Sequence, residues 1–514
     1  MSENERRDLP LGETGTAEDM DAVMRKYDRE SATRIWEGTP RIVVGVISAL
    51  FSLYCIWSTL WSTADLPIRL SAFLGLIVIM GYLNYPARKG HVTPNSIPWY
   101  DVVIMVLGAG SFFYYCFNYS RLVMVISSAA KIDPSNPDAV AGAWFYVILG
   151  AAGVLCLAEL CRRCVGLPIL CVVGALLVYT FASGLGLPRV IYTLFFGTSG
   201  VMATPIQVCA KFIAVFIVFG AFLERTGISG FFIDLANCAA GASSGGPAKV
   251  AVISSALCGM VSGSSVGNTV TTGSVTIPMM KRTGYQGEFA AAVEAAASTG
   301  GQIMPPIMGA AAFLMAEYMG VTYASVALKA ILPALLYFTG IFLAVHLEAR
   351  RLGLRGIPRE QLPKLKGLIR SIYLLLPLAV LVGMVSTGAR TLQFSAAVAI
   401  VLTILVSLPG IFLNSGTRHG GPLAVRAAKD LGRMIGSSLE AGGRGCITVA
   451  VACSMAGIVA GCITVTGLAS KLVSAVVNVS RMIPNQSLAM FIALFLTMLC
   501  CIVLGMGVPT TANY

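Results

Sequence analysis

The chain has 514 residues, of which 56% are hydrophobic and 12% charged, and its formal net charge is +12. Its mean hydropathy of +0.80 excludes an ordinary soluble domain. The positive charge does not indicate nucleic-acid binding, because Lys and Arg cluster in short loops between apolar stretches, as they do in cytoplasmic loops of membrane proteins.

Apolar stretches long enough to cross a bilayer recur from Ile42 onward, since a membrane-spanning helix needs about 20 apolar residues. Residues 1–40 are polar, lack the apolar core of a signal peptide, and are predicted to form a cytoplasmic tail with an interfacial helix at Met20–Trp36. The predicted spans are 42–61, 66–86, 100–120, 143–161, 167–183, 207–224, 286–318, 322–348, 367–386, 391–414, 442–464 and a stretch from about 486. The sequence therefore predicts an all-α polytopic membrane protein.

Between the sixth and seventh spans lie an amphipathic stretch at 229–241 and a broken segment at 247–280. With the N-terminus in the cytoplasm, the basic loops fall on the cytoplasmic side only if the broken segment enters and leaves on the same face. These basic positions are Arg88/Lys89, Arg162/Arg163, Lys281/Arg282 and the loops 349–366 and 415–435. The segment is therefore predicted to be a re-entrant hairpin that enters from the cytoplasm.

The turn of this hairpin, Gly259–Thr269, reads GMVSGSSVGNT. Its glycines at a spacing of four are also typical of a helix-packing face. Hydroxyl side chains on every face would be costly against lipid, however, and irregular backbone at membrane depth occurs where it is buried or lines a water-filled cavity. Its carbonyl and hydroxyl oxygens suit a hard monovalent cation such as Na⁺, whereas the N-termini of half-helices suit a carboxylate.

A second interruption, Glu294–Met308, reads EAAASTGGQIMPPIM inside a long span. The pairs Gly300-Gly301 and Pro305-Pro306 predict an unwound helix, because proline lacks the N–H and clashes with the preceding turn. A structural kink is the alternative to an ion site here. Glu294 is an ionisable residue in a span and hence a functional candidate, although a helix-packing or interfacial carboxylate explains it equally well.

A third broken segment, Ile502–Asn513, reads IVLGMGVPTTAN and aligns with the first when Gly505 is matched to Gly263. An odd number of spans separates the two copies, so the second is predicted to be inverted and its hairpin to enter from outside. Paired broken segments in two halves of a membrane protein indicate the binding site of a transporter.

Sequence signals of catalysis are lacking. His91, His346 and His419 lie at span ends or in loops without metal-ligand spacing, and no phosphate-binding Gly-rich loop occurs. The pair Cys161/Cys164 has no second Cys pair or nearby His, which argues against a metal or redox site. Lys211 is best explained by a side chain that reaches toward the membrane surface, with contact to an anionic substrate as the alternative.

Three motifs in order, GMVSGSSVGN…GSVTIPMMKRTGY, EFAAAVEAAASTGGQIMPP and LGMGVPTTANY, resemble the large membrane subunit of tripartite ATP-independent periplasmic (TRAP) transporters. The tail motif KYDRESATRIWEG and the extra N-terminal spans resemble fused small and large subunits, and the chain is similar to the branch served by TAXI-type binding proteins. The resemblance implies inverted repeats, an elevator-like motion and a location in the bacterial inner membrane.

The resemblance also implies a class of solute, a coupling ion and a partner protein. A periplasmic binding protein is expected to deliver a small organic acid, such as a C4-dicarboxylate, or an amino acid, and Na⁺ is expected as the coupling ion. No other cofactor, transition metal, nucleic acid or enzymatic activity is expected, and the surrounding partner is membrane lipid. A stand-alone Na⁺/carboxylate symporter that needs no binding protein is the alternative. A channel and an intramembrane hydrolase are disfavoured by the opposed hairpins and by the absence of a His beside Ser264 or Ser265.

The broken segments and the resemblance together define the predicted site. The ion-binding residues are expected to be Ser262, Gly263, Ser264, Ser265, Asn268, Thr269, Thr299, Gly301, Gln302, Gly505, Gly507, Thr510 and Thr511. Substrate contacts are expected at Ser264, Asn268, Pro305, Pro306, Pro509, Thr510 and Asn513.

The predicted spans, the broken segments and the resemblance divide the chain into six regions. They are a tail (1–40), small-subunit-like helices (41–140), connecting helices (141–206), a first transport repeat (207–366), scaffold helices (367–435) and a second, inverted and incomplete repeat (436–514). Because the chain ends at Tyr514 on the tip of the second hairpin, it is expected to be a fragment or a truncated product that lacks half of its second ion site.

Overall fold

The computed structural model describes residues 33–87, 94–129, 137–358, 365–388, 390–416, 423–468 and 486–505, together with positions 360, 362, 363, 470, 471 and 474. Within these residues the fold is all-α and contains no strand, as predicted. Eight of the described helices are long and apolar enough to cross a membrane. The chain forms two compact units, here called the hairpin unit (Phe219–Ala312 and Gly320–Ser438) and the N-terminal unit (Ala32–Val218, Phe313–Met319 and 439 onward).

The N-terminal unit contains the long helices that follow the tail. They are α2 (Gly38–Leu60), α3 (Leu66–Asn84), α4 (Trp99–Ala129), α5 (Pro137–Cys164) and α6 (Leu167–Ala182). Shorter pieces follow, namely α7 (Leu187–Ile191), a π-helix η1 (Tyr192–Phe196), α8 (Thr204–Val208) and a π-helix η2 (Cys209–Ile213). The helix α21 (Gln486–Gly505) is also part of this unit.

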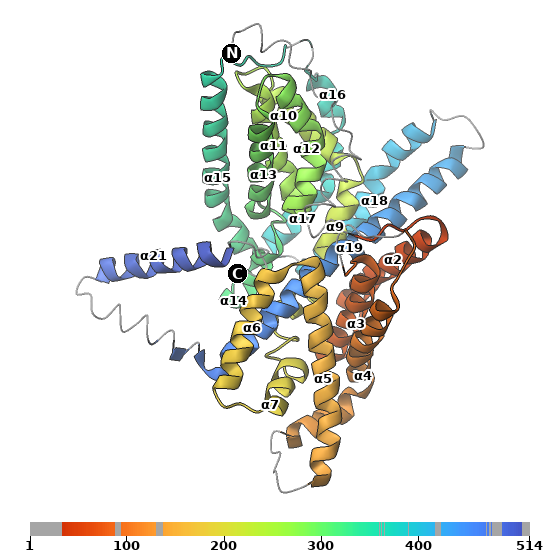
Figure 1. Ribbon diagram of the computed structural model, residues 1–514. Coiled ribbons are helices and arrows are strands. Elements are labelled where there is room, and N and C mark those ends of the chain that lie inside the picture. The colour runs from red at the N-terminus through yellow and green to blue at the C-terminus, as the bar shows by residue number, and fades with distance from the viewer. Residues whose placement is uncertain are drawn as a thin grey trace. The chain divides into compact units, whose positions relative to one another are not determined.

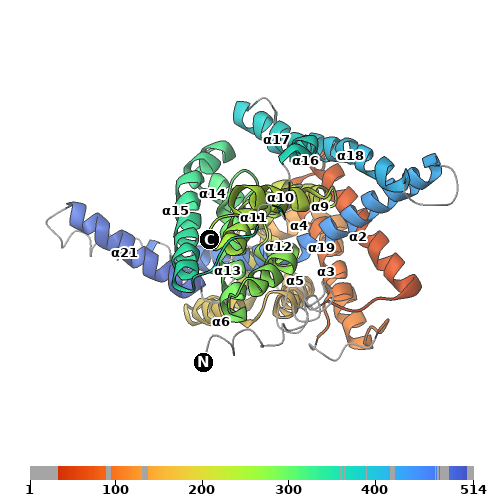
Figure 2. The same ribbon diagram turned by 90° about the horizontal axis from the view of Figure 1, so that it is seen from above.

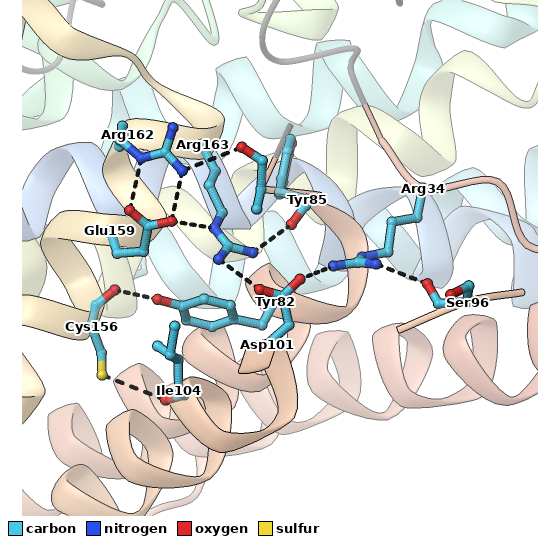
Figure 3. Close-up of polar contacts among 11 residues, drawn as sticks. Arg34, Tyr82, Tyr85, Ser96, Asp101, Ile104, Cys156, Glu159, Arg162 and Arg163 are labelled. Carbon is cyan, nitrogen blue, oxygen red and sulfur yellow. Dashed lines mark hydrogen bonds and ion pairs between the residues drawn. The ribbon is translucent and has the colours of Figure 1, made fainter. Parts of the chain in front are cut away.

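A buried network of ion pairs ties the start of this unit together (Figure 3). The Asp101 carboxylate at the beginning of α4 is fully buried and pairs with Arg34, which precedes α2, and with Arg163 of α5, at 2.7 Å for the latter. Arg163 also donates to Glu159 at 2.8 Å. Burial lowers the pKa of the Arg34 guanidinium, and the neighbouring Asp101 carboxylate opposes that shift. Because removing one partner of a buried pair costs about 3–5 kcal/mol, this network fixes the segment before α2 against α4 and α5.

The hairpin unit contains the helices that carry the predicted site (Figures 1 and 2). They are α10 (Ile228–Ala240), α11 (Gly246–Ser262), α12 (Ser265–Arg282), α13 (Gly287–Gly300), a 3₁₀ turn η3 (Gly301–Ile303) and α15 (Tyr323–Arg351). The unit continues with α16 (Leu365–Arg370), η5 (Ile372–Leu375), α17 (Leu376–Thr387) and α18 (Leu392–Gly416). Three helices contain residues of both units: α9 (Ala214–Glu224), α14 (Ala310–Met319) and α19 (Leu423–Thr466).

Helices α11, α12 and α13 pack against one another, and α15 covers α11 and α13. Their shared core is apolar and includes Ala251, Met280, Ala290, Ala297 and Phe338. The first turn of α11 contains Pro247, which lacks the N–H that this turn would leave unpaired. The N-terminus of α15 is capped by the Thr322 side chain.

One predicted loop has a different structure. Residues 415–435 were expected to form a basic loop before a span at 442–464, but from Leu423 they belong to α19, a single helix of 44 residues. The basic residues in this stretch are good helix formers and no proline follows Leu423 before Thr466, so nothing ends the helix. Such a helix is about 66 Å long, twice the thickness of the hydrocarbon core.

The predicted interfacial helix at Met20–Trp36 lies mostly outside the described residues, and residues 33–36 are not helical. The amphipathic stretch at 229–241 is the helix α10. The borders of the six predicted regions, the inverted repeat and the side of the membrane on which the N-terminus lies stay predictions.

Candidate functional site

The hairpin turn between α11 and α12 consists of Gly263 and Ser264. Gly263 adopts a left-handed conformation (φ +61°), which L side chains rarely adopt, and a Cβ there would also meet the Met308 carbonyl oxygen. Ser264 is the N-cap of α12, where its Oγ accepts a hydrogen bond from the Gly267 N–H at 3.2 Å. The segment is therefore two half-helices joined by a tight turn, as predicted from its Gly and Ser residues.

The long span predicted at 286–318 is broken at the predicted place. Helix α13 ends at Gly300, η3 covers Gly301–Ile303, and regular helix resumes only at Ala310 in α14. The stretch between them contains Pro305 and Pro306, joined by a cis peptide bond, and the Pro306 carbonyl accepts a hydrogen bond from the Tyr323 hydroxyl at 2.9 Å.

The hairpin and the broken helix approach each other through their backbones. A Cβ on Gly301 would lie 2.6 Å from the Cα of Gly259 and 3.1 Å from Nδ2 of Asn268, so only glycine fits. The Gln302 amide donates to the Ser265 hydroxyl at 3.1 Å, and its backbone carbonyl accepts from the Gly309 N–H at 2.7 Å. Residues from the two predicted segments are thus brought together.

Asn268 lies in the first turn of α12 and is 1% exposed. Its Nδ2 donates to the Ser255 carbonyl of α11 at 2.8 Å, whereas its Oδ1 is buried without a hydrogen-bond partner in the part of the chain that the structure describes. A buried amide oxygen without a donor is costly, by about 1–3 kcal/mol, unless something else satisfies it.

Some of the predicted ligands have side chains whose hydroxyls bond or approach backbone carbonyls close to them in sequence. The Thr269 hydroxyl donates to the Ser265 carbonyl of its own helix at 2.9 Å, and the exposed Thr299 hydroxyl donates to the Ala295 carbonyl at 2.8 Å. The Ser262 hydroxyl lies 3.4 Å from the Ser264 carbonyl. Gly505 ends α21, whereas Gly507, Pro509, Thr510, Thr511 and Asn513 lie outside the described residues.

A carboxylate lies behind the turn. Glu294 of α13 is fully buried, and its carboxyl group is surrounded by hydroxyl groups from three helices. Its hydrogen-bond partners are Ser255 of α11 (2.8 Å), Thr272 and Thr276 of α12 (2.5 Å for Thr276) and Ser298 of α13 (3.1 Å). Sequence reasoning singled out Glu294 but not Ser255 or Thr276. The i,i+4 spacing of Thr272 and Thr276, which places both hydroxyls on one helix face, is the signal that was available.

Lys211 and Glu224, at the two ends of one apolar span, lie apart from this turn in sequence. The Lys211 ammonium lies over the ring of Phe212, 4.9 Å from its centroid, in the π-helix η2. Glu224 lines a small pocket of the hairpin unit together with Ser262, Asn268 and Thr271.

An all-α membrane protein in which a helical hairpin packs against a broken helix has features that are typical of secondary transporters. Residues 152–514 match the family model described as "Tripartite ATP-independent periplasmic transporter, DctM component". The chain belongs to this family, which confirms the resemblance to TRAP large permeases.

Curated relatives agree with this assignment. The chain is 31% identical over 219 residues to the C4-dicarboxylate TRAP transporter large permease protein DctM of Pseudomonas aeruginosa, covering 40% of this chain and 50% of the relative. It is 28% identical over 272 residues to the protein of the same name from Vibrio cholerae, covering 51% and 55%. It is 27% identical over 254 residues to the isethionate TRAP transporter permease protein DctMQ of Oleidesulfovibrio alaskensis, covering 47% and 37%. The chain spans about half the length of the first two of these relatives.

Proposed function

We propose that this chain is the permease component of a TRAP-type secondary transporter that takes up a small organic anion or amino acid, coupled to Na⁺. In this proposal the chain lies in the bacterial inner membrane with its N-terminus in the cytoplasm, joins small- and large-subunit parts in one polypeptide, and receives its solute from a periplasmic binding protein of the TAXI type. The C4-dicarboxylate permeases among its relatives support a carboxylate as solute.

One observation carries the ion-coupling part of this proposal. The backbones of Gly259 and Gly301 meet beside the side-chain amide of Asn268, with its Nδ2 atom nearest to them. The Oδ1 atom of the same amide is buried and has no donor among the described residues. Oxygen atoms are the ligands that hard cations prefer. The N-terminus of α12 at the same turn offers N–H groups to a carboxylate.

The test is uptake of a labelled C4-dicarboxylate into vesicles that contain the full-length protein, with and without its binding protein and a Na⁺ gradient. Asn268→Ala and Gly301→Val are expected to lower Na⁺-dependent uptake. Thr387→Ala is the matched control, because the exposed Thr387 hydroxyl bonds only within its own helix α17.

Three outcomes would contradict parts of the proposal. Equal Na⁺ stimulation in the Asn268→Ala variant and the wild type removes Asn268 from the ion site. Uptake that does not need the binding protein favours a stand-alone Na⁺/carboxylate symporter. Uptake that Na⁺ does not affect contradicts sodium coupling.

A further inference from the structure

The carboxyl group of Glu294 lies in an environment that is unusual for a charge. The side chains of Glu294 and of its four hydroxyl partners are all 0% exposed. Around them the helices present apolar residues, among them Ala251, Ala290, Val293 and Ala297. Among the described residues no Lys, Arg or His forms an ion pair with Glu294. An isolated carboxylate in such a place normally becomes neutral instead of remaining charged.

The charged and titratable groups on the neighbouring helices do not neutralise a negative charge on the Glu294 carboxyl group. On α11, the Lys249 ammonium bonds the Ser243 hydroxyl and lies over Phe342, and Cys258 is a neutral thiol one turn beyond Ser255. On α15, the Tyr337 hydroxyl donates to the Ala296 carbonyl at 2.9 Å. The remaining ones lie at or near the helix ends, namely Lys281 and Arg282 on α12, Glu288 on α13, and Lys329, His346, Glu348, Arg350 and Arg351 on α15.

The two oxygens of the carboxyl group have different surroundings. Oε1 faces three hydroxyls, those of Ser255, Thr272 and Ser298. Of the residues described, only Thr276 bonds Oε2, and its Oγ1 lies 2.5 Å away. The carbonyl oxygen of a carboxylic acid accepts hydrogen bonds and its hydroxyl donates one. Oε1 therefore has the surroundings of the carbonyl oxygen, and Oε2 those of the hydroxyl.

The number of hydrogen atoms available for hydrogen bonds at Thr276 also assigns the acid hydrogen to Oε2. Its Oγ1 has one hydrogen but two acceptors within reach, Oε2 of Glu294 and the Thr272 carbonyl at 3.0 Å. If Glu294 is charged, only one of these hydrogen bonds forms. If Oε2 carries a hydrogen, it donates to Thr276 and Thr276 donates to the Thr272 carbonyl, so both form.

We propose that Glu294 is a proton-binding site of the transport core, with its carboxyl group neutral at neutral pH and the hydrogen of Oε2 donated to Thr276. The bound proton connects α13 to both arms of the hairpin, α11 and α12. Loss of the proton leaves a charge in an apolar core without a cation, and this weakens the connection. Ser255, Thr272 and Thr276 are not among the predicted Na⁺ ligands, so the proton site and the proposed ion site differ in most of their side chains.

Infrared difference spectroscopy of the full-length protein tests the protonation state directly. The spectrum at neutral pH is expected to contain the carbonyl band of a protonated carboxylic acid, and Glu294→Gln is expected to remove it. Glu288→Gln is the matched control, because Glu288 is exposed in the first turn of the same helix. Thr276→Val removes the acceptor of the acid hydrogen and is expected to shift the band without abolishing it.

If Glu294→Gln instead removes the band of an ionised carboxylate from the wild-type spectrum, Glu294 is charged and the proposal is overturned. Loss of the acid band in the Glu288→Gln control would also overturn it, since the band would then not belong to Glu294. Because glutamine matches glutamic acid in shape and is neutral, the variant is expected to fold, and the Thr276→Val shift gives an independent result from a protein that retains Glu294.

Whether this proton takes part in transport rests on the proposed function and needs a second measurement. At a fixed Na⁺ gradient, uptake by the wild type is expected to change with pH, whereas the uptake that remains in Glu294→Gln is expected to be independent of pH. An unchanged pH profile contradicts a role of the proton in transport. If the wild type takes up no solute at all, the proposed function fails, but the infrared result still decides whether Glu294 binds a proton.

Discussion

Replacing Gly301 by alanine is expected to destabilise the protein, although a glycine-to-alanine change in a helical segment usually stabilises it by about 0.4–1 kcal/mol. Gly301 begins η3 in an ordinary helical conformation, so backbone strain does not oppose the change. The opposing factor is space, because the new Cβ would lie 2.6 Å from the Cα of Gly259 and 3.1 Å from the Asn268 amide. Ordinary carbon–carbon contact needs about 3.5–4.0 Å.

The hairpin helix α11 and η3 must therefore separate by about 1 Å, in a region held together by hydrogen bonds on both sides of the contact. Overpacking of this kind costs about 1–3 kcal/mol, which exceeds the gain in backbone entropy. We expect a net loss of about 1–2 kcal/mol. Thermal or denaturant unfolding of the purified protein measures it. The displaced Asn268 amide should also weaken binding of radioactive Na⁺ under the proposed function.

Gly340→Ala is the matched control. Gly340 lies in the middle of α15, and a Cβ there would meet nothing within 4 Å, so this substitution is expected to stabilise the protein slightly. The two glycine-to-alanine changes should thus shift the unfolding temperature in opposite directions. Equal shifts for the two variants would show that the backbones at Gly259 and Gly301 do not meet as described.

Three further substitutions test other parts of the structure by the same unfolding measurement. Asp101→Asn is expected to cost about 3–5 kcal/mol, because it leaves Arg34 and Arg163 buried beside a neutral amide. Ser264→Ala removes the N-cap of α12 and is expected to cost about 1 kcal/mol. Tyr285→Phe is expected to be neutral or stabilising, because the Tyr285 hydroxyl is buried without a hydrogen-bond partner.

For each of these three predictions, a control substitution or a stated outcome shows whether the prediction is wrong. Glu348→Gln breaks a solvent-exposed ion pair with Arg351 (3.5 Å) and should change stability by less than about 1 kcal/mol. A loss of similar size in Asp101→Asn would mean that the buried network does not form. Thr322→Ala removes the N-cap of α15 and should match Ser264→Ala in stability. A clear loss of stability in Tyr285→Phe would reveal a partner for its hydroxyl.

Local chemistry allowed the sequence to predict where helices break. Gly263 with Ser264 at the hairpin turn, and Gly301 with Pro305 in the broken helix, are residues that either tolerate left-handed backbone or cannot continue a helix. Such signals depend on the residue itself and its neighbours. The positions of both breaks were therefore predictable without a structure.

Contacts between helices were less predictable. Ser255 lies beside Ser254 in the helix α11, and its sequence neighbours give no sign that its hydroxyl bonds a carboxyl group 39 positions later. Arg163 was interpreted only as a marker of the cytoplasmic side, whereas its guanidinium forms a buried pair with Asp101. The charge rule assigns a side of the membrane and says nothing about secondary structure, which is why the stretch from Leu423 was predicted as a loop.

The hairpin and the broken helix are connected by two kinds of contact: one requires residues without a side chain, and the other requires side chains that form hydrogen bonds. Near the turn, Gly259 and Gly301 bring two backbones together by having no side chain. Farther along the helices, Glu294 and its hydroxyl partners join the same elements by directional hydrogen bonds. Apolar packing alone would let α12 rotate or slide, because lipid-like surfaces have no preferred register. The polar contacts therefore define the register in which Asn268 faces the broken helix, so that disturbing Glu294 should alter the proposed ion site although it contributes no ligand to it.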